Sequence, residues 1–168
     1  FKIETELREK MHIPIMHDDQ HGTAIISSAA LLNALEIVGK KIEDVKIVVN
    51  GAGAAAVSCT KLYIALGARK ENIVMCDSKG VLNTERTNLD DIKKQFVTQR
   101  KISTLQEAIK GADVFAGLSV ANAITPDDLN VMAKDPIVFA LANPDPEISY
   151  DLAMKTRKDI VMATGRSD

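Results

Sequence analysis

The sequence has no marked excess of charge of either sign. Its 21 basic and 23 acidic residues leave a formal net charge of −2, so a basic face for binding nucleic acid is not expected. Internal repeats and low-complexity segments are also missing. A chain of 168 residues with 46% apolar and 26% charged side chains is typical of one folded domain rather than of a disordered protein.

Long hydrophobic runs and cysteines are scarce as well. We find no apolar stretch long enough to span a bilayer and no secretory signal pattern, so no membrane partner is expected. Cys59 and Cys76 lie in apolar helix or strand contexts without C-x-x-C spacing. We therefore expect two reduced core thiols in a cytoplasmic protein rather than a disulfide or a metal site.

Short apolar runs predict a parallel sheet. Runs without polar alternation belong to strands that are covered on both faces. Helical patterns with capping residues separate these runs, and strand alternating with helix predicts an α/β domain with a doubly wound, mostly parallel sheet. The expected strands are 45–49, 73–76, 114–116, 137–141 and 160–163, and the expected helices are 54–66, 104–109, 125–133 and a helix from 149 or 151 to about 155.

Two further segments are predicted to be helical. Residues 20–38 are apolar on nearly every face, which indicates a helix buried between this domain and another part of a protein. Residues 80–99 are polar and charged, with Leu89, Ile92 and Phe96 at helical spacing. We expect a surface helix there.

The run from Asn50 to Ala56 is the strongest pattern in the chain. It predicts a buried strand, a glycine turn and a helix that begins directly after the turn. Gly51 permits the tight turn, and Gly53 lets the backbone approach a pyrophosphate at the helix N-terminus. Asp77, about twenty residues on, is placed to bind the ribose hydroxyls. These features predict a Rossmann-type dinucleotide site; the alternative is a glycine-rich corner in another α/β protein.

Polar residues follow the carboxyl ends of the other expected strands. In an open parallel sheet the ligand crevice lies outside those ends. A dinucleotide bound at the first turn would extend toward Ser119 and Asn143, which we expect at its nicotinamide end. The alternatives are an ordinary loop serine at 119 and a turn-forming Asn-Pro pair at 143.

Two adjacent carboxylates, Asp18 and Asp19, precede the helix predicted at 20–38. One of them can cap the helix, and both favour the positive end of its dipole. Only one can be the cap, however, and Gly22 leaves room for a ligand nearby. Because Mg²⁺ and Mn²⁺ are bound by one or two carboxylates together with substrate oxygens, a metal site is the second interpretation.

The segment His17–Ala24 closely resembles a signature of the bacterial-type malic enzymes. The resemblance extends over essentially the whole chain and includes residues 50–55, 77–80, 139–144, Pro146-Glu147 and 163–168. Members of this family catalyse oxidative decarboxylation of L-malate to pyruvate and CO₂ with NAD or NADP and a divalent metal, Mg²⁺ or Mn²⁺. The chain is thereby identified as similar to their NAD(P)-binding domain.

The resemblance implies a role for each residue of the site. It makes Asp19 the metal ligand, Asp18 a catalytic carboxylate that orients neighbouring groups, and Asn143 a contact of malate or of the nicotinamide. It assigns the ribose of the adenosine half to Asp77. The pyrophosphate would be bound by Gly51, Ala52, Gly53, Ala54 and Ala55.

The resemblance also implies protein outside this sequence. Family members have a Glu-Asp pair just before the segment that matches residues 1–4, and an N-terminal domain with the tyrosine and lysine that act as acid and base. We therefore expect residues 1–40 to border that domain in a homo-oligomeric enzyme, a dimer or larger. Alone, the 168 residues are expected to bind dinucleotide weakly and to leave malate unreacted.

Asp77 also bears on the choice between NAD and NADP. A carboxylate about 5 Å from a 2′-phosphate would oppose it by roughly 3 kcal/mol at an effective dielectric constant of about 20, which favours NAD, although Lys79 or Arg86 could offset part of this. Two other functions stay open. One is a metal-independent NAD(P) dehydrogenase of another small acid, and the other is a dinucleotide-sensing module without chemistry of its own.

Overall fold

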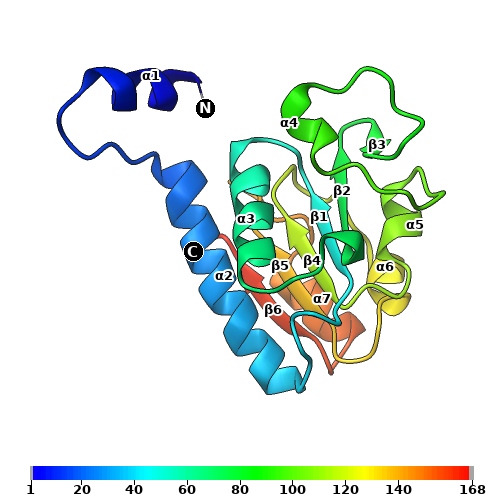
Figure 1. Ribbon diagram of the computed structural model, residues 1–168. Coiled ribbons are helices and arrows are strands. Elements are labelled where there is room, and N and C mark those ends of the chain that lie inside the picture. Colours follow the sequence, from blue (N-terminus) through cyan, green and yellow to red (C-terminus); the bar gives the residue numbers. More distant parts are fainter. Residues whose placement is uncertain (1, 167–168) are drawn as a thin grey trace.

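The computed structural model describes residues 2–166, which form a six-stranded sheet between two layers of helices (Figure 1). The strand order is β3-β2-β1-β4-β5-β6, and every neighbouring pair is parallel except β2 with β3. The predicted doubly wound, mostly parallel α/β sheet is therefore confirmed. The strands are β1 (Ile47–Asn50), β2 (Ile73–Asp77), β3 (Gly80–Val81), β4 (Val114–Gly117), β5 (Ile137–Ala140) and β6 (Val161–Thr164).

Helices cover both faces of the sheet. Figure 1 shows α2 and α3 on one side and α5, α6 and α7 on the other, with α1 away from the sheet beyond the start of α2. The helices are α1 (Lys2–Lys10), α2 (Asp18–Val38), α3 (Ala54–Ala65), α4 (Asp91–Lys94), α5 (Leu105–Ile109), α6 (Pro126–Asn130) and α7 (Tyr150–Thr156), with a 3-10 turn at Lys70–Asn72.

Successive strand residues pack into two separate cores. Ile47 and Val49 face α2 and α3, where Tyr63 is also buried. Val48 and Phe115 face the opposite layer. Because both faces of β1, β4 and β5 are buried along their whole lengths, these strands appear in the sequence as unbroken apolar runs.

Two predicted helices, α5 and α6, begin where the sequence predicts, and each has a side-chain cap. Thr104 with Glu107 and Thr125 with Asp128 each form a capping box, which satisfies two free N–H groups at the helix start. The helix predicted at 125–133 ends earlier, at Asn130. Its last residues instead pair with the chain before β4, since Val131 O accepts from Gly111 N and Ala133 N donates to Ala112 O.

The surface helix predicted at 80–99 is wrong. Most of this segment is extended or turned: β3 pairs with β2, and α4 is the short helix within it. Leu82 N donates to Met75 O, and Thr98 N donates to Leu82 O. Leu89 and Phe96 are buried. Pairing with the sheet edge therefore outweighs the local helical spacing.

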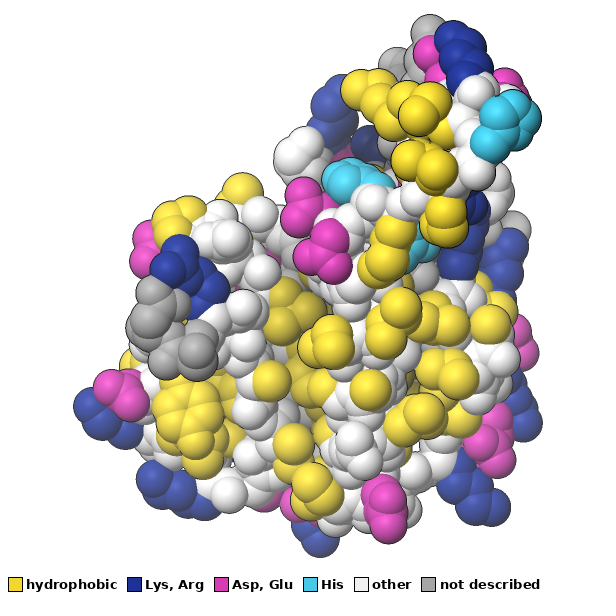
Figure 2. Space-filling view, turned by 90° about the vertical axis from the view of Figure 1, so that its left-hand side faces the viewer, with side chains coloured by type: hydrophobic (Ala, Val, Ile, Leu, Met, Phe, Trp, Pro, Cys, Tyr) yellow, Lys and Arg dark blue, Asp and Glu magenta, His cyan; other side chains and the backbone are white. Residues whose placement is uncertain are grey.

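The long helix α2 is buried on one face only. Leu31 and Leu35 pack in the core, whereas Ile26 and Ile37 are 71% and 73% exposed. Figure 2 shows hydrophobic side chains gathered over this side of the molecule. Contrary to our expectation, α2 is long and apolar enough to cross a membrane by length and composition. Those two properties do not distinguish a span from a core helix.

Candidate functional site

A cleft of about 540 Å³ lies where the parallel strands end. Its volume is in the range of small-molecule sites, and the carboxyl end of the sheet is where open α/β folds bind ligands. The lining includes Asp18 and Asp19 from α2, Ala55 from α3, Ser119 after β4 and Asn143 after β5. The structure thus brings together five of the predicted site residues from distant parts of the chain.

The glycine turn between β1 and α3 adjoins this cleft through Ala55. Gly51 has a φ of 130°, and a Cβ there would lie 2.4 Å from Leu118 O, so the turn requires glycine. A Cβ at Gly53 would meet nothing within 4 Å. The N-terminus of α3 therefore faces open space, and its free N–H groups fit the diphosphate of a dinucleotide. Gly51 to Ala54 form this turn and do not line the cleft itself.

Asp77 lies outside the cleft, at the end of β2, and its carboxylate is fully engaged. Arg86 donates to both oxygens at 3.1 Å, Lys93 Nζ to Oδ2 at 3.0 Å and Lys79 N to Oδ1 at 2.9 Å. Partial burial raises the pKa of Asp77, but these hydrogen bonds outweigh it and lower the pKa from 3.8 to about 2. The roughly four acceptor positions of a carboxylate are therefore taken, and a ribose hydroxyl finds none free.

The two predicted nicotinamide contacts, Ser119 and Asn143, differ in their surroundings. Ser119 Oγ accepts a hydrogen bond of 2.7 Å from Asn50 Nδ2, so it is tied to the end of β1. Asn143 is exposed and is followed by a cis peptide bond to Pro144. Both side chains line the cleft, and their proposed contacts stay predictions.

Neither Asp18 nor Asp19 caps α2. The cap position is His17, which makes no side-chain cap hydrogen bond, so the simple capping interpretation is not observed. The side chain of Asp19 is 91% exposed, with Oδ2 3.7 Å from His17 Nε2. A Cβ at Gly22 would lie 2.0 Å from Asp18 Oδ1, and the carboxylate of Asp18 therefore lies directly over the glycine.

The carboxylates of Asp18 and Asp19, the acidic pair of α2, are suited to form one part of a metal site. Exposed carboxylates beside a cleft are suitable ligands for Mg²⁺ or Mn²⁺. However, residues 2–166 contain no group of three or more His, Cys, Asp or Glu side chains placed to bind one metal ion. This part of the chain alone therefore does not form a complete metal site.

Cys59 and Cys76 are free and buried, as predicted for core thiols. Burial raises the pKa of Cys59 above its usual 9.0. Burial, together with the nearby charge of Asp77, raises the pKa of Cys76 to about 12. Both side chains are thus protonated at neutral pH and unreactive.

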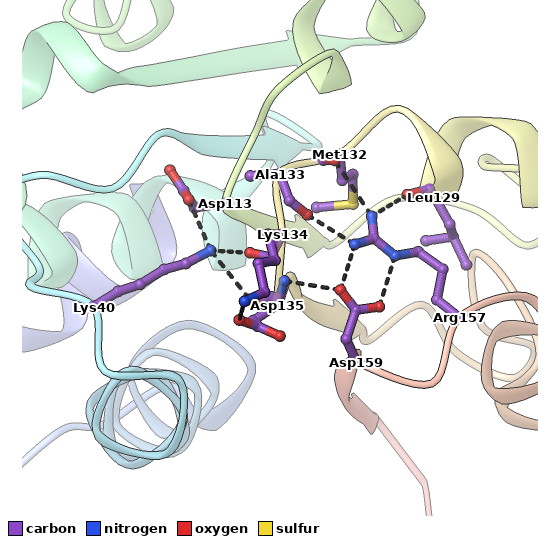
Figure 3. A network of polar contacts seen from close by, with 9 residues as sticks. All are labelled: Lys40, Asp113, Leu129, Met132, Ala133, Lys134, Asp135, Arg157 and Asp159. Atoms are coloured by element: carbon purple, nitrogen blue, oxygen red, sulfur yellow. Dashed lines mark hydrogen bonds and ion pairs between the residues drawn. The ribbon is translucent and has the colours of Figure 1, made fainter.

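A second polar cluster lies at the opposite, amino end of the strands (Figure 3). No sequence motif indicates it. Lys40 Nζ donates to Asp113 Oδ1 at 2.9 Å, while Arg157 pairs with Asp159 and lowers its pKa. Each cation also donates to backbone carbonyls, those of Lys134 and Asp135 for Lys40 and those of Leu129, Met132 and Ala133 for Arg157.

Comparison with known proteins shows which family this chain resembles over its length. Residues 20–167 match the protein family described as "Malic enzyme, NAD binding domain". The chain is 54% identical to the NADP-dependent malic enzyme of Halomonas elongata over 168 residues, which are the whole chain and 40% of that enzyme. It is 52% identical to the NADP-dependent malic enzyme of Haemophilus influenzae over 170 residues, and it spans 22% of that protein.

A solved structure shows the same fold. The NAD-dependent malic enzyme of Thermotoga maritima superposes with a TM-score of 0.91 at 44% identity, over all of this chain and 45% of that one. Three residues, Phe1, Ser167 and Asp168, lie outside the described residues. The last two belong to the segment 163–168 that carries part of the family resemblance.

Proposed function

The chain belongs to the malic enzymes as their NAD-binding domain, and from this premise we propose that it serves the oxidative decarboxylation of L-malate to pyruvate and CO₂. The main support is the cleft in which the acidic pair on α2, the start of α3 and Asn143 meet. No segment of the sequence brings these groups together; the parallel sheet does. We expect the activity itself to require the remainder of a protein like its relatives.

The chain's own residues bind and orient in this proposal. The N–H groups at the start of α3 hold the diphosphate, and Gly53 leaves the space for it. A dinucleotide held there would supply the acceptor for a hydride from C2 of malate. Ser119 and Asn143, beside the cleft, orient the nicotinamide and malate, and Asp18 orients neighbouring catalytic groups.

We further propose NADP rather than NAD as the preferred dinucleotide. Our expectation from the sequence was that Lys79 or Arg86 would offset only part of the Asp77 charge. In the structure Arg86 and Lys93 are both paired with it, so the cluster has two positive charges and one negative. A 2′-phosphate is attracted by that net charge, and Arg86 and Lys93 are suitable donors for it. A ribose hydroxyl would have to compete with them for Asp77.

Asp19 is proposed as one ligand of a Mg²⁺ or Mn²⁺ ion. Its exposed position in the cleft suits a ligand completed by malate oxygens and by protein outside this chain. When bound, such an ion polarises the substrate carbonyl. The roles proposed for Asp18 and Asn143 do not depend on which of the two metals is used.

The exposed face of α2 is proposed to be covered in the full-length enzyme. Ile25, Ile26, Leu32 and Ile37 together leave an apolar surface larger than isolated exposed side chains would. Because the chain spans 40% or less of the curated relatives described above, the rest of such a protein, or a second copy in a homo-oligomer, is available to cover it. A cytoplasmic location also remains part of the proposal.

A chimaeric enzyme tests the proposed reaction. In the Halomonas elongata enzyme the matching 168 residues are replaced by this chain, and malate-dependent NADPH formation is measured with Mg²⁺ or Mn²⁺. Asp19→Asn should lower the rate at least about hundredfold while NADPH binding stays the same, because the metal contributes several kcal/mol to catalysis. Asp91→Asn, at an exposed acid on α4, serves as the matched control.

Other outcomes would contradict the proposal. Full activity of Asp19→Asn without added metal would favour a metal-independent dehydrogenase. An inactive chimaera that still binds NADPH would favour a dinucleotide-sensing module. The unmodified 168-residue chain should form no NADPH from malate at all.

A further inference from the structure

A carboxylate lies completely buried beneath the cleft. Glu147 is 0% exposed, and burying a carboxylate is costly unless hydrogen bonds replace its water. Its Oε1 accepts from Ser119 N at 3.0 Å, and its Oε2 accepts from Ala142 N at 3.0 Å. One side chain thus joins the loop after β4 to the loop after β5.

The last residue of β4 leaves room for this carboxylate. A Cβ on Gly117 would lie 2.3 Å from Glu147 Cδ and 2.6 Å from each of its oxygens. Any side chain larger than hydrogen at 117 would therefore displace the carboxyl group. The glycine and the glutamate fit together, and the family resemblance assigns no role to either.

The buried carboxylate is also linked to β1. Ser119 Oγ lies 3.4 Å from Glu147 Oε1 and accepts from Asn50 Nδ2. Asn50 is the last residue of β1, directly before the glycine turn. These contacts connect the ends of β1, β4 and β5, and the strand order reverses between β1 and β4, where a dinucleotide crosses the sheet edge.

We propose that Glu147 is the positioning residue for the nicotinamide end of the cleft. By accepting from Ser119 N and Ala142 N, its carboxylate sets the distance between the loops that present Ser119 and Asn143. Small displacements of such groups are costly because hydride transfer requires close alignment. This inference rests on the proposed function, since it assumes that a dinucleotide occupies the cleft.

Substitution of Glu147→Gln is the central test. Glutamine has the same shape as glutamate, but its NH₂ group would face either Ser119 N or Ala142 N. That N–H group would then lack an acceptor. We expect the affinity of the 168-residue chain for NADPH to fall roughly tenfold, as for loss of one charge-assisted hydrogen bond. Binding of adenosine 2′,5′-bisphosphate, which lacks the nicotinamide half, should stay within about twofold. Isothermal calorimetry measures both affinities.

The matched control is Asp128→Asn. Asp128 is also a buried carboxylate, and it accepts from Thr125 N and Thr125 Oγ1 in the capping box of α6. Asp128→Asn should lower the stability of the chain and leave the ratio of its affinities for NADPH and adenosine 2′,5′-bisphosphate unchanged. If Glu147→Gln does not fold, Glu147→Asp is measured instead. It retains the charge on a shorter side chain, and the same selective loss is expected.

The outcomes separate this inference from the proposed function. Equal weakening of both ligands by Glu147→Gln, or no weakening of either, would overturn the positioning role. Failure of the unmodified chain to bind either ligand would overturn the proposed function and this inference with it. A selective loss for NADPH supports both.

Discussion

The two ends of the sheet use polar side chains in opposite ways. At the amino end, Lys40, Asp113, Arg157 and Asp159 are paired with one another or with backbone carbonyls. At the carboxyl end, Asp19 is 91% exposed and lines a cleft. Charged side chains thus join segments of the chain at the amino end of the sheet, whereas at the carboxyl end an acidic side chain faces an open cleft.

This difference separates stability from binding. Charged groups with internal partners stabilise the fold, while groups that face a cleft are available to a ligand. Asp77 and Glu147 show that the carboxyl end also contains internally paired carboxylates. Glu147 is bound to Ser119 and Ala142, which line the cleft, whereas Asp77 lies outside the cleft at the end of β2.

The largest expected effect comes from Gly51→Ala at the carboxyl end. With a φ of 130° and Leu118 O 2.4 Å from the new methyl, the turn must distort. We expect a loss of about 3 kcal/mol in the free energy of unfolding and no detectable binding of NADPH. Gly111→Ala is the control at the amino end, with a φ of 70° and nothing within 4 Å. It should cost about 1 kcal/mol and leave binding intact.

Arg157→Ala should destabilise the amino end without affecting the cleft. It removes the donor to Asp159 and to the carbonyls of Leu129 and Ala133, so we expect a loss of about 3 kcal/mol in urea unfolding. NADPH affinity of the remaining folded protein should change less than twofold. Lys158→Met, at an exposed neighbour, should have little effect. Weaker NADPH binding by Arg157→Ala would contradict the separation of the two ends.

Acid unfolding tests how strongly the paired carboxylate of Asp77, at the end of β2, stabilises the fold. Because the pKa of Asp77 is lowered from 3.8 to about 2 in the folded state, its contribution is present above pH 4. It is lost as the pH falls through 2. That contribution is about 2 kcal/mol, and Asp77→Asn should remove this part of the pH dependence of unfolding. An unchanged profile for Asp77→Asn between pH 4 and 2 would show that Arg86 and Lys93 do not stabilise the ionised form.

The smallest effect is expected for Lys40→Met. Its ammonium group bridges Asp113 and the chain before β5, but it is partly exposed, so the loss should be about 1 kcal/mol. Thermal unfolding measures it, with the exposed Lys41→Met as the matched control. A loss as large as that for Arg157→Ala would mean that the two halves of the network act as one unit.

The sequence is informative where a local pattern decides the structure. The apolar runs predict the parallel strands, and Thr104 with Glu107 predicts a helix start. The segment 80–99 is mispredicted because its hydrogen bonds go to Met75 and Ser103, which lie outside the segment. The amino-end network and Lys93 are missed for the same reason. Each joins residues that only the fold brings together, and no motif marks them.

Part of the site could be predicted in the same way. Because parallel strands end at one edge, polar residues after different strands had to converge, and Ser119 and Asn143 do line one cleft. Asp18 and Asp19 reach the same cleft from the start of α2, which follows no strand. The state of Asp77 could not be predicted from its position. It depends on Arg86 and Lys93, which pair with Asp77 over the strand end and on which our proposal of NADP rests.

The uninterrupted helix α2 has a mechanical consequence. Asp19 lies at its first turn, while Leu35, about 24 Å further along at 1.5 Å per residue, is buried against the sheet layer. Buried residues hold this helix along its whole length, from Gln20 and Ala24 beside the acidic pair to Leu35. A substitution that shifts the packed face of α2 would therefore displace Asp19 relative to the strand ends, although it touches no residue of the cleft.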